Sequence, residues 1–527
     1  MTFCPVSLTP FLKVHPMKSP VPYFQIAITV FCFCITIPMT HAAEKNVIFF
    51  ITDDESPTLG CYGDKVAKTP NIDALALDGL RFTHAFATTA SCSASRSVVL
   101  SGLHNHYNGQ YGHTHHFHKF TSFPAVISLA LPRAMARTGY RTAQIGKYHV
   151  APEDVFHFEN YLPGNGRNAV AMANSAKNFI IDTTDERPFF LYFATTDPHR
   201  GGGVDENSEM VLKPNLFGNK PDRKAWDGIN EVFYNPAQVP IPHFLSDTTE
   251  SREELAQYYQ SVSRIDQGLG RLVQILKAAN LYDKTMIIFT SDHGMAFSGG
   301  KTTTYEGGLQ VPFVVRNPYA KQRGTTTSAM ISHIDITPSI LDFAGGLDKE
   351  TNGPKKTMDW RTYYKEKGIG RLDNLNGGHA FDRYHGKSWL PVVADPSQKH
   401  WDTIFASHTF HEIQMYYPMR VVRDVEFKLI WNIAAGLPYP FASDLWAASS
   451  WQAQFKKGLD APYGQRTVGE YINRPKFELF NISKDPHEQH NLAADPKYSE
   501  ILDRYKAKLK SHQKLMNDPW IMKWEYE

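Results

Sequence analysis

The stretch NVIFFITDD, residues 46–54, decides the fold class of this 527-residue chain. An uninterrupted apolar run followed at once by acidic residues is typical of a strand buried on both faces of a parallel sheet. Three further runs share this character: residues 142–145, 189–193 and 286–289. Amphipathic stretches with apolar residues at helical spacing lie between them, at residues 72–80 and 255–279. The alternation predicts an α/β fold with a mostly parallel central sheet flanked by helices.

The pattern of predicted secondary structure changes near Gly377. Short β-like pieces occur at residues 403–405, 417–422, 427–431 and 477–480, and a helical pattern follows at 498–516. We therefore expect two units, residues 43–376 and a smaller α+β domain at 377–527 that carries an antiparallel sheet. Residues 201–242, rich in Gly, Asn and Pro, predict a long surface loop.

The first 42 residues are typical of a signal peptide. Lys13 and Lys18 precede an apolar run at residues 24–38, and small residues end at Ala42 and Ala43. The run is shorter than the roughly 20 residues of a membrane-spanning helix. We expect cleavage near Ala42 and export to the periplasm or the medium, with no membrane span. A single clear glycosylation sequon, at Asn481, favours a bacterial periplasm over a lysosome.

Composition narrows the function classes. With 42% hydrophobic residues the chain can bury a large core, and a formal charge of +2 argues against nucleic acid as a partner. Cys4, Cys32 and Cys34 lie in the leader, so only Cys61 and Cys92 remain after cleavage. Two cysteines do not make a disulfide scaffold. They are either free thiols or an incidental bridge.

Polar clusters follow the predicted core strands. They are Asp53-Asp54, Lys147-Tyr148-His149, Asp197-Pro198-His199 and Ser291-Asp292-His293-Gly294. Each cluster alone is also explained by a helix cap or a turn. Because ligands of open α/β sheets bind beyond the carboxyl ends of the strands, we expect the four clusters to meet in one crevice. The carboxylates supply the hard oxygen ligands that calcium or magnesium takes.

Residues 91–102, SCSASRSVVLSG, predict a short helix that begins near Cys92 and is capped by Ser93 or Ser95. Cys92 then lies at the positive end of the helix, which favours an anion and lowers a thiol pKa, with Arg96 one turn further on. Acidic metal ligands nearby argue against a simple thiolate nucleophile.

This stretch resembles the signature of the sulfatases, Cys-x-Ala-Ser-Arg followed by Leu-Ser-Gly, in which the cysteine is oxidised to formylglycine. The resemblance extends through Asp53-Asp54, Gly146-Lys147-x-His149, Asp292-His293-Gly294, residues 301–312 (KTTTYEGGLQVP) and the closing Phe477-Glu-Leu-Phe…Asp485-Pro-His-Glu…Asn491-Leu-Ala. It implies the alkaline-phosphatase-like sulfatase fold and an enzyme that hydrolyses sulfuric esters or sulfamates. Ala94 stands where many sulfatases have proline. Alanine is compatible with the oxygen-independent radical route of maturation, so the resemblance implies a formylglycine-generating maturase as a partner.

The same resemblance implies roles for individual residues. It places calcium on Asp53, Asp54, Asp292, His293 and an oxygen of the modified Cys92. Arg96 would favour loss of a proton from the attacking hydroxyl, and Lys147 and Lys301 would hold the sulfate oxygens. His199 would protonate the leaving atom and His149 would remove the second hydroxyl proton, with the two histidine roles open to exchange.

Three segments outside this signature resemble the sulfamidases, or heparan N-sulfatases. They are Ser101-Gly-Leu…Asn108-Gly-x-Tyr111-Gly, Asp197-Pro-His-Arg200 and His411-Glu412…Met415…Tyr417-Pro-Met-Arg420. The likeness implies a sulfated saccharide substrate. Residues 43–376 would then be the catalytic domain, and residues 377–527 would contribute to the substrate pocket. The residues expected to face the sugar are Arg200, His411, Glu412 and Arg420.

Three alternatives remain open at this point. One is an O-sulfatase acting on a marine or host glycan, since one scaffold serves many sugars. A second is a phosphonate or phosphodiester hydrolase of related fold. A third is a sugar-binding protein that keeps Cys92 unmodified.

Overall fold

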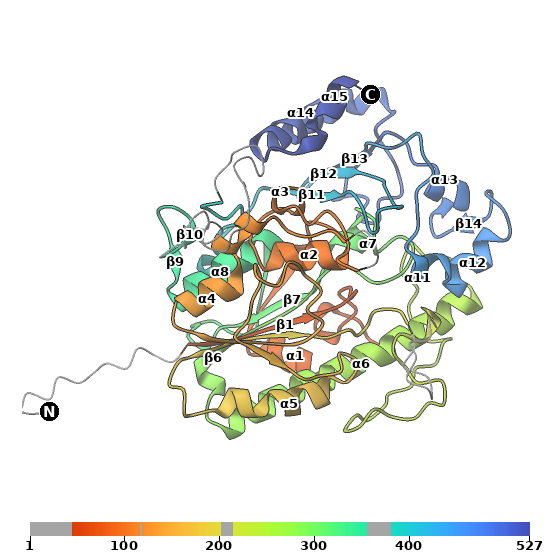
Figure 1. Ribbon diagram of the computed structural model, residues 1–527. Helices are drawn as coiled ribbons and strands as arrows, with labels where there is room; N and C mark the ends of the chain where they lie inside the picture. Colours follow the sequence, from red (N-terminus) through yellow and green to blue (C-terminus); the bar gives the residue numbers. More distant parts are fainter. Residues whose placement is uncertain (1–44, 116–118, 202–213, 356–380, 527) are drawn as a thin grey trace, which may run out of the picture. The chain divides into compact units, whose positions relative to one another are not determined.

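The computed structural model describes residues 45–115, 119–201, 214–355 and 381–526 (Figure 1). The predicted signal peptide at 1–42 and the predicted boundary between residues 376 and 377 lie outside the described residues. Within these ranges, no helix combines the length and the apolar character needed to cross a membrane.

An eight-stranded sheet forms the centre of the fold, with the strand order β4-β3-β5-β1-β6-β7-β2-β8. The strands are β1 (Asn46–Thr52), β2 (Leu80–Phe86), β3 (Arg141–Gly146), β4 (Asn160–Leu162), β5 (Phe189–Ala194), β6 (Thr285–Ser291), β7 (Phe313–Arg316) and β8 (Thr325–Ser332). Only β7 runs antiparallel to its neighbours β6 and β2; the other pairs are parallel. The predicted mostly parallel sheet and its four core strands are confirmed.

Helices cover both faces of this sheet (Figure 1). On one face lie α1 (Pro70–Leu77), α5 (Ala169–Ile181) and α6 (Thr249–Ala278); on the other lie α2 (Cys92–Val99), α4 (Leu131–Arg137), α8 (Ile336–Ala344) and α10 (Leu390–Ala394). Along β1, Ile48 and Phe50 point into the first layer, whereas Phe49 and Ile51 point into the second. The unbroken apolar run of β1 is therefore explained by burial on both sides. Leu80, predicted as helical, instead begins β2.

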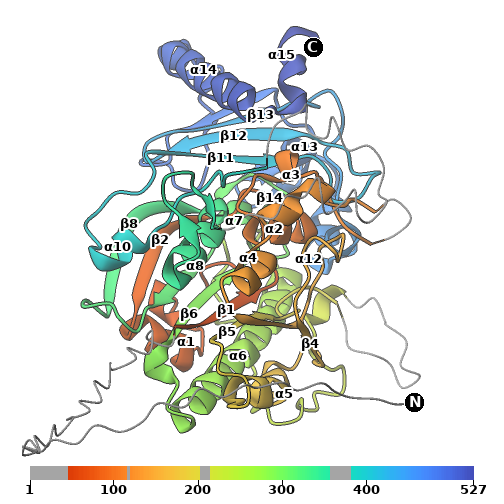
Figure 2. The same cartoon turned by 60° about the vertical axis from the view of Figure 1, so that its left-hand side comes forward.

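A second, antiparallel sheet has the order β11-β12-β13-β16. Its strands are β11 (Thr403–His408), β12 (Met419–Asp424), β13 (Lys428–Asn432) and β16 (Phe477–Phe480). One face packs against α14 (Ser499–Leu515), as Figure 2 shows, and the other against the end of β2 and α7 (Glu306–Leu309). Residues 44–527 form one compact unit, so this sheet is not set apart from the catalytic region.

The remaining elements are short. They are α3 (Asn105–Asn108), β9 (Leu347–Asp348), β10 (Gly353–Pro354), α11 (Ser443–Trp446), α12 (Ser449–Phe455), β14 (Pro462–Tyr463), β15 (Arg466–Thr467), α13 (Val468–Ile472) and α15 (Lys523–Tyr526). Of the predicted loop at 201–242, the described part holds only a 3-10 turn at Pro214–Leu216 and irregular backbone, as expected.

A buried ionic network joins α7 to the second sheet. The carboxylate of Glu306 lies 3.0 Å from both Arg423 and Lys428, and Lys428 lies 2.7 Å from Glu488. All four side chains are at most 10% exposed. Removing one partner of such a network leaves an uncompensated buried charge, so the network holds the two parts in one arrangement.

Four histidines pack where α14 meets the region of α3. His104 lies against His106, His385 and His512 with ring centroids 5.2 to 5.6 Å apart, and His512 stacks on Phe405. Burial lowers the pKa of His106 to about 4 and that of His385 and His512 to about 3. The negative charge of Asp518 raises the pKa of His106 and His512, but by less than burial lowers it.

This cluster predicts acid sensitivity of the fold. Because the folded pKa values lie below the unfolded value of about 6.5, the unfolded chain binds protons first, and stability falls as the pH drops below about 6.5. Replacing His512 by Phe keeps the ring on Phe405 and removes one titrating group. We expect the loss of unfolding free energy between pH 7 and pH 5 to shrink by about 1 to 2 kcal/mol in His512→Phe. Chemical denaturation at both pH values measures it, with exposed His157→Phe as the control. An unchanged pH dependence in His512→Phe would contradict the assignment.

Candidate active site and divalent-metal centre

Four neighbouring strands of the central sheet deliver the polar clusters to one place. In the order β3-β5-β1-β6, the chain leaves β3 before Lys147, β5 before His199, β1 before Asp53 and β6 before Asp292. Cys92 and Arg96 come from α2, whose first residue is Cys92. The structure thus brings the residues expected to bind metal and sulfate into contact with one another.

Several residues of the site have a left-handed backbone conformation, which sets the direction of their side chains. Asp54, His149 and Thr302 have φ values of 66°, 52° and 66°, which non-glycine residues rarely adopt. Gly146 has φ 84°, and a Cβ there would lie 2.1 Å from the carbonyl oxygen of Ala194. Only glycine therefore lets β3 turn at this point and present Lys147. Strained residues clustered at one place are a frequent mark of a functional site.

Asp53 is fully buried between two cations. Its carboxylate accepts a hydrogen bond from Arg96 Nη2 at 3.0 Å and another from Lys147 Nζ. Although burial raises the pKa of a carboxyl, Lys147 and Arg96 hold the pKa of Asp53 well below its usual range. Burial lowers the pKa of Lys147, but Asp53 and its other acidic neighbours together raise it above the usual value. Both groups stay charged at neutral pH.

Asp54 is linked to the second half of the chain through Lys301. Lys301 Nζ lies 2.9 Å from Asp54 and 3.1 Å from Asp444 on α11. The same ammonium donates to His199 Nε2 at 2.9 Å, while His199 Nδ1 donates to the carbonyl oxygen of Arg200. Burial and Lys301 lower the pKa of His199 to about 4. His199 is therefore the neutral Nδ1–H tautomer, with its Nε2 lone pair turned toward the centre.

Asp292 has one satisfied and one unsatisfied carboxylate oxygen. Oδ1 accepts from the backbone N–H groups of Asp54 and His293, at 3.0 and 2.9 Å. Oδ2 lies 3.1 Å from Arg96 but accepts no hydrogen bond from any described residue, although it is buried. Burial raises the pKa of Asp292 to about 6. A buried carboxylate oxygen without a donor fits a metal ligand.

His293 directs a ring nitrogen at the centre. Its Nδ1 lies 3.0 Å from the carbonyl oxygen of Gly294 and donates there, so Nε2 is unprotonated in the neutral ring. That nitrogen lies 3.1 Å from Asp54 Oδ1 and 3.4 Å from Cys92 Sγ. A metal ion held between this nitrogen and the Asp54 carboxylate would be bound by both. Metal-bound histidines commonly donate their second N–H to a carbonyl in this way.

The charges of the centre also call for a cation. Among the described residues its carboxylates are Asp53, Asp54, Asp292 and Asp444, and its cations are Arg96, Lys147 and Lys301. With neutral histidines, four negative groups against three positive ones leave a formal charge of −1. A divalent ion makes the total positive, which suits an anionic substrate. Carboxylate oxygens dominate the donor set, as calcium and magnesium prefer.

Two predictions about the helix start at Cys92, the lowered thiol pKa and the capping serine, are wrong. The Cys92 thiol is fully buried, and burial raises its pKa well above the usual value despite Lys147 and Lys301, whereas the start of a helix predicted a lowered pKa. The cap prediction is also wrong, because Ser91 precedes the helix and Ser95 donates instead to the carbonyl oxygen of Asp292. Both Cys61 and Cys92 are free, so the bridge is excluded and Cys61 is only half-buried. A thiolate nucleophile at position 92 is disfavoured.

Several contacting residues escaped the sequence analysis. Asp444 forms an ion pair with Lys301, and Arg96 Nη1 donates a hydrogen bond to the Tyr192 hydroxyl at 3.2 Å. His113 and His115 lie beside His149. Tyr192 lies within a predicted strand and looked like core. Asp444 is far from the signature along the chain, and nothing local in the sequence distinguishes it from a surface acid.

The four residues expected to face the sugar separate into two pairs. His411 lies 3.2 Å from Ser91 Oγ, next to Cys92, and Glu412 lies 3.8 Å from His115. Arg200 is instead buried and pairs with Glu254 on α6. Arg420 is buried and pairs with Asp518. The placement of the two arginines indicates a structural role, not contact with a sugar in the centre.

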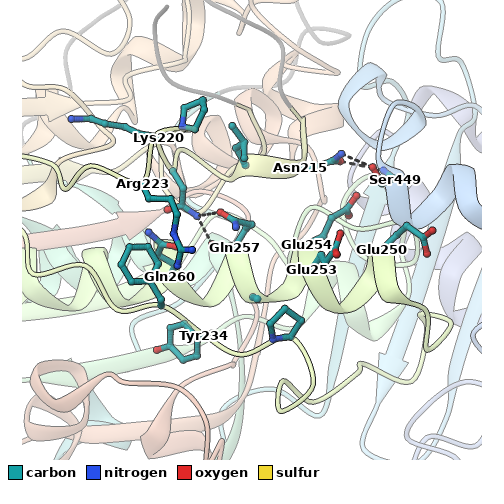
Figure 3. A pocket seen from close by; sticks show the side chains of 16 residues that line it. Asn215, Lys220, Arg223, Tyr234, Glu250, Glu253, Glu254, Gln257, Gln260 and Ser449 are labelled. Atoms are coloured by element: carbon teal, nitrogen blue, oxygen red, sulfur yellow. Dashed lines mark hydrogen bonds between the residues drawn. The ribbon is translucent and has the colours of Figure 1, made fainter.

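A pocket lies apart from this centre. It has a volume of about 460 Å³ and is lined by α6, the chain after Pro214 and Ser449 of α12 (Figure 3). None of the residues predicted for metal or sulfate lines it. Glu254, the partner of Arg200, belongs to its wall, so the Arg200 ion pair fixes one side chain of this pocket.

Comparison with known proteins decides the family. Residues 45–346 match the family described as Sulfatase. The chain belongs to the sulfatase family. A human relative named N-sulphoglucosamine sulphohydrolase is 33% identical over 96% of both chains. This sulfatase is thus a hydrolase of sulfate esters or sulfamates.

Solved structures support the same fold. A protein solved in complex with its substrate D-glucosamine-2-N,6-O-disulfate has a TM-score of 0.59 at 19% identity, covering 90% of this sulfatase and 98% of that chain. A phosphonate monoester hydrolase of Agrobacterium radiobacter has a TM-score of 0.58 at 19% identity, covering 90% and 96%. At this identity the likeness concerns the fold alone, which is the expected sulfatase fold.

The placement of Arg420 yields a prediction. Replacing Arg420 by Met leaves Asp518 as an unpaired buried charge, so we expect a loss of about 3 to 5 kcal/mol of unfolding free energy. Denaturant unfolding measures it. The control is Arg383→Met, because Arg383 and Asp382 form an exposed pair, 75% and 66% accessible, for which a change within about 1 kcal/mol is expected. A stable Arg420→Met with a raised KM would instead return Arg420 to the substrate pocket.

Proposed function

We propose that this sulfatase removes the N-sulfate from a glucosamine unit of a sulfated polysaccharide. The observation that carries the proposal is the 33% identity to human N-sulphoglucosamine sulphohydrolase, which spans both chains almost end to end. A match of this extent includes residues 403–480 of the second sheet, the region expected to shape the substrate pocket. Degradation of a glycosaminoglycan or a related polysaccharide is the corresponding biological role.

The proposed metal is calcium, held by Asp53, Asp54, Asp292 and His293 with an oxygen on residue 92. Oδ2 of Asp292, which is buried and accepts no hydrogen bond from a described residue, and Nε2 of His293, which faces Asp54 and Cys92, support this ligand set. When bound, calcium supplies positive charge that polarises a sulfate oxygen and favours loss of a proton from the attacking hydroxyl. His293 is a softer ligand than calcium usually takes, but the carboxylates dominate the set.

Formylglycine is the proposed form of residue 92. Its hydrated aldehyde would supply two hydroxyl groups, one as the nucleophile toward sulfur and one as the proton donor for the release of sulfate. Oxidation by a maturase precedes this chemistry, and Ala94 favours the oxygen-independent route. The high pKa of the unmodified thiol supports the proposal, since an unmodified Cys92 is a weak nucleophile at neutral pH.

Two lysines are suited to bind the sulfate. Lys147, which follows β3, forms an ion pair with Asp53, and Lys301, which precedes α7, forms one with Asp54. The two ammonium groups therefore reach the expected metal ligands from different elements. Asp53 and Asp444 raise the pKa of Lys147 and Lys301 respectively against the effect of burial, which keeps both charged. Charge fixed in this way stabilises the sulfuryl group as its bond to the leaving atom lengthens. Arg96 adds a third fixed positive charge beside Asp53.

Two histidines handle protons. His199 is held by its Nδ1–H bond to Arg200, and its Nε2 accepts a hydrogen bond from the Lys301 ammonium. We assign it to protonation of the leaving nitrogen or oxygen: Nε2 first takes up a proton from the ammonium and then gives that proton to the leaving atom. His149, neutral because burial and Lys147 lower its pKa, has an Nε2 able to accept the second hydroxyl proton. Exchange of the two roles is the alternative assignment.

His411 and Glu412 are the proposed contacts to the sugar. The predicted signal peptide at 1–42 would direct the enzyme to the periplasm or the medium.

The substrate assignment is tested on a panel of sulfated sugars. Mature enzyme is incubated with N-sulfated glucosamine, with glucosamine and galactosamine carrying 6-O-sulfate, with a sulfated uronic acid and with phosphonate monoesters. We expect sulfate release to be fastest from the N-sulfated sugar. A higher kcat/KM for an O-sulfated sugar would replace the proposal by a polysaccharide O-sulfatase, and one for a phosphonate by a phosphonate hydrolase.

Position 92 gives an independent prediction. Cys92→Ala removes the side chain that carries both hydroxyls, so turnover should fall by about 10³-fold or more. The fold should persist, because alanine fits at a helix start and the change removes a single buried sulfur. The matched control is Cys61→Ala, which removes a thiol outside the centre and should retain activity. Measurable turnover in Cys92→Ala, or an unmodified thiol in the mass spectrum of the active enzyme, would contradict the formylglycine assignment.

A further inference from the structure

Three histidines converge beside the carboxylate centre. His113 Nδ1 lies 3.1 Å from His115 Nδ1, and His115 Nδ1 lies 3.0 Å from His149 Nε2. The three nitrogen atoms all lie within 4.8 Å of one another. Imidazole nitrogens that share a tetrahedral metal with bonds of about 2.0 to 2.1 Å are a little over 3 Å apart. The cluster is therefore close to the geometry of a three-histidine metal site.

The outward nitrogens of two of these rings face acceptors. His113 Nε2 lies 3.0 Å from His411 Nδ1, and His115 Nε2 lies 3.8 Å from the carboxylate of Glu412. Metal-bound histidines commonly donate the second N–H to a carboxylate or another acceptor, which orients the ring and makes the ligating nitrogen more basic. With protons on these outer nitrogens, the inner nitrogens of His113 and His115 are the ligand atoms that face each other and His149.

Backbone N–H groups of residues 113 and 114 hold this segment against His411 and against α2. The N–H of His113 donates to the carbonyl oxygen of His411 at 2.9 Å, and the N–H of Thr114 donates to Ser93 Oγ on α2 at 3.2 Å. His113 is 4% exposed, whereas the His115 side chain is 41% exposed. The cluster is thus anchored on its inner side and open to ions from solvent at His115.

We propose that His113, His115 and His149 form a second metal site, selective for a transition-metal ion such as zinc over calcium. Neutral imidazoles suit zinc, copper and nickel, whereas calcium takes oxygen ligands, so this site and the carboxylate centre differ in preference. The outer partners His411 and Glu412 tune the affinity. The binding itself does not depend on the proposed sulfatase mechanism.

Occupation of this site has a consequence for turnover that does rest on the proposed function. His149 Nε2 is both a ligand of the second site and the nitrogen assigned to the hydroxyl proton. An ion bound there removes its lone pair from catalysis. Zinc is therefore a reversible inhibitor that lowers kcat, and a chelator selective for zinc over calcium restores it.

Metal binding is measured first, without any assay of turnover. Zn²⁺ is titrated into the full mature enzyme by calorimetry with calcium in excess, so that the carboxylate centre is occupied, and Co²⁺ serves as an optical probe of nitrogen ligation. We expect one zinc per chain and cobalt bands typical of low-coordinate nitrogen sites. His115→Ala should abolish this binding, and Glu412→Gln should weaken it by about 10- to 100-fold. His157→Ala, which removes an exposed histidine elsewhere, should leave it unchanged.

Two outcomes overturn the site. One is zinc binding that His115→Ala leaves intact and that excess calcium displaces, which places the ion on the carboxylates. The other is the absence of binding to the wild-type enzyme. Inhibition is then compared as the ratio of each variant's turnover with and without Zn²⁺, so a change in basal activity does not affect the comparison. Binding without inhibition would keep the site and reject the assigned role of His149.

Discussion

The structure depends on the neutralisation of carboxylates that are buried side by side at the ends of β1 and β6. Asp53, Asp54 and Asp292 are all inaccessible to solvent, and like charges this close repel one another strongly in a medium of low dielectric constant. Each is matched by a cation from another element: Arg96 of α2, Lys147 after β3 or Lys301 before α7. The centre is stable only because the whole central sheet brings these elements together.

That constraint explains the form of the surrounding chain. The strand order places the ends of β3, β5, β1 and β6 next to one another, and Gly146 and the left-handed Asp54 turn the chain where the side chains must point inward. The remaining imbalance of one negative charge is best relieved by a divalent ion. A centre built to hold an excess of positive charge once the ion is bound then attracts a sulfate group, so metal binding and substrate binding follow from one electrostatic arrangement.

The core strands and the convergence of their ends were predictable because both are local signals. An apolar run such as 46–51 is buried wherever it lies, and the ends of parallel strands meet at one edge of a sheet. Burial of a polar group cannot be predicted from the local sequence. The sequence around Cys92 showed that a helix begins there, but the pKa of its thiol is raised by burial among residues that are distant in the sequence. Asp444 and His113 were missed for the same reason. Arg200 and Arg420 lie in segments shared with sulfamidases, yet likeness to a family does not tell whether a side chain faces the pocket or a buried partner.

The second sheet is part of the catalytic unit for an electrostatic reason. Asp444 shares Lys301 with Asp54, so a side chain from the C-terminal region sets how much positive charge remains for the centre. His411 reaches Ser91, the residue before Cys92, and Glu306 ties α7, close behind Lys301, to β12 and β13. These contacts belong to a single compact unit, residues 44–527. A change in the C-terminal region that moves Asp444 or His411 therefore also changes the electrostatics around Lys301 and Cys92.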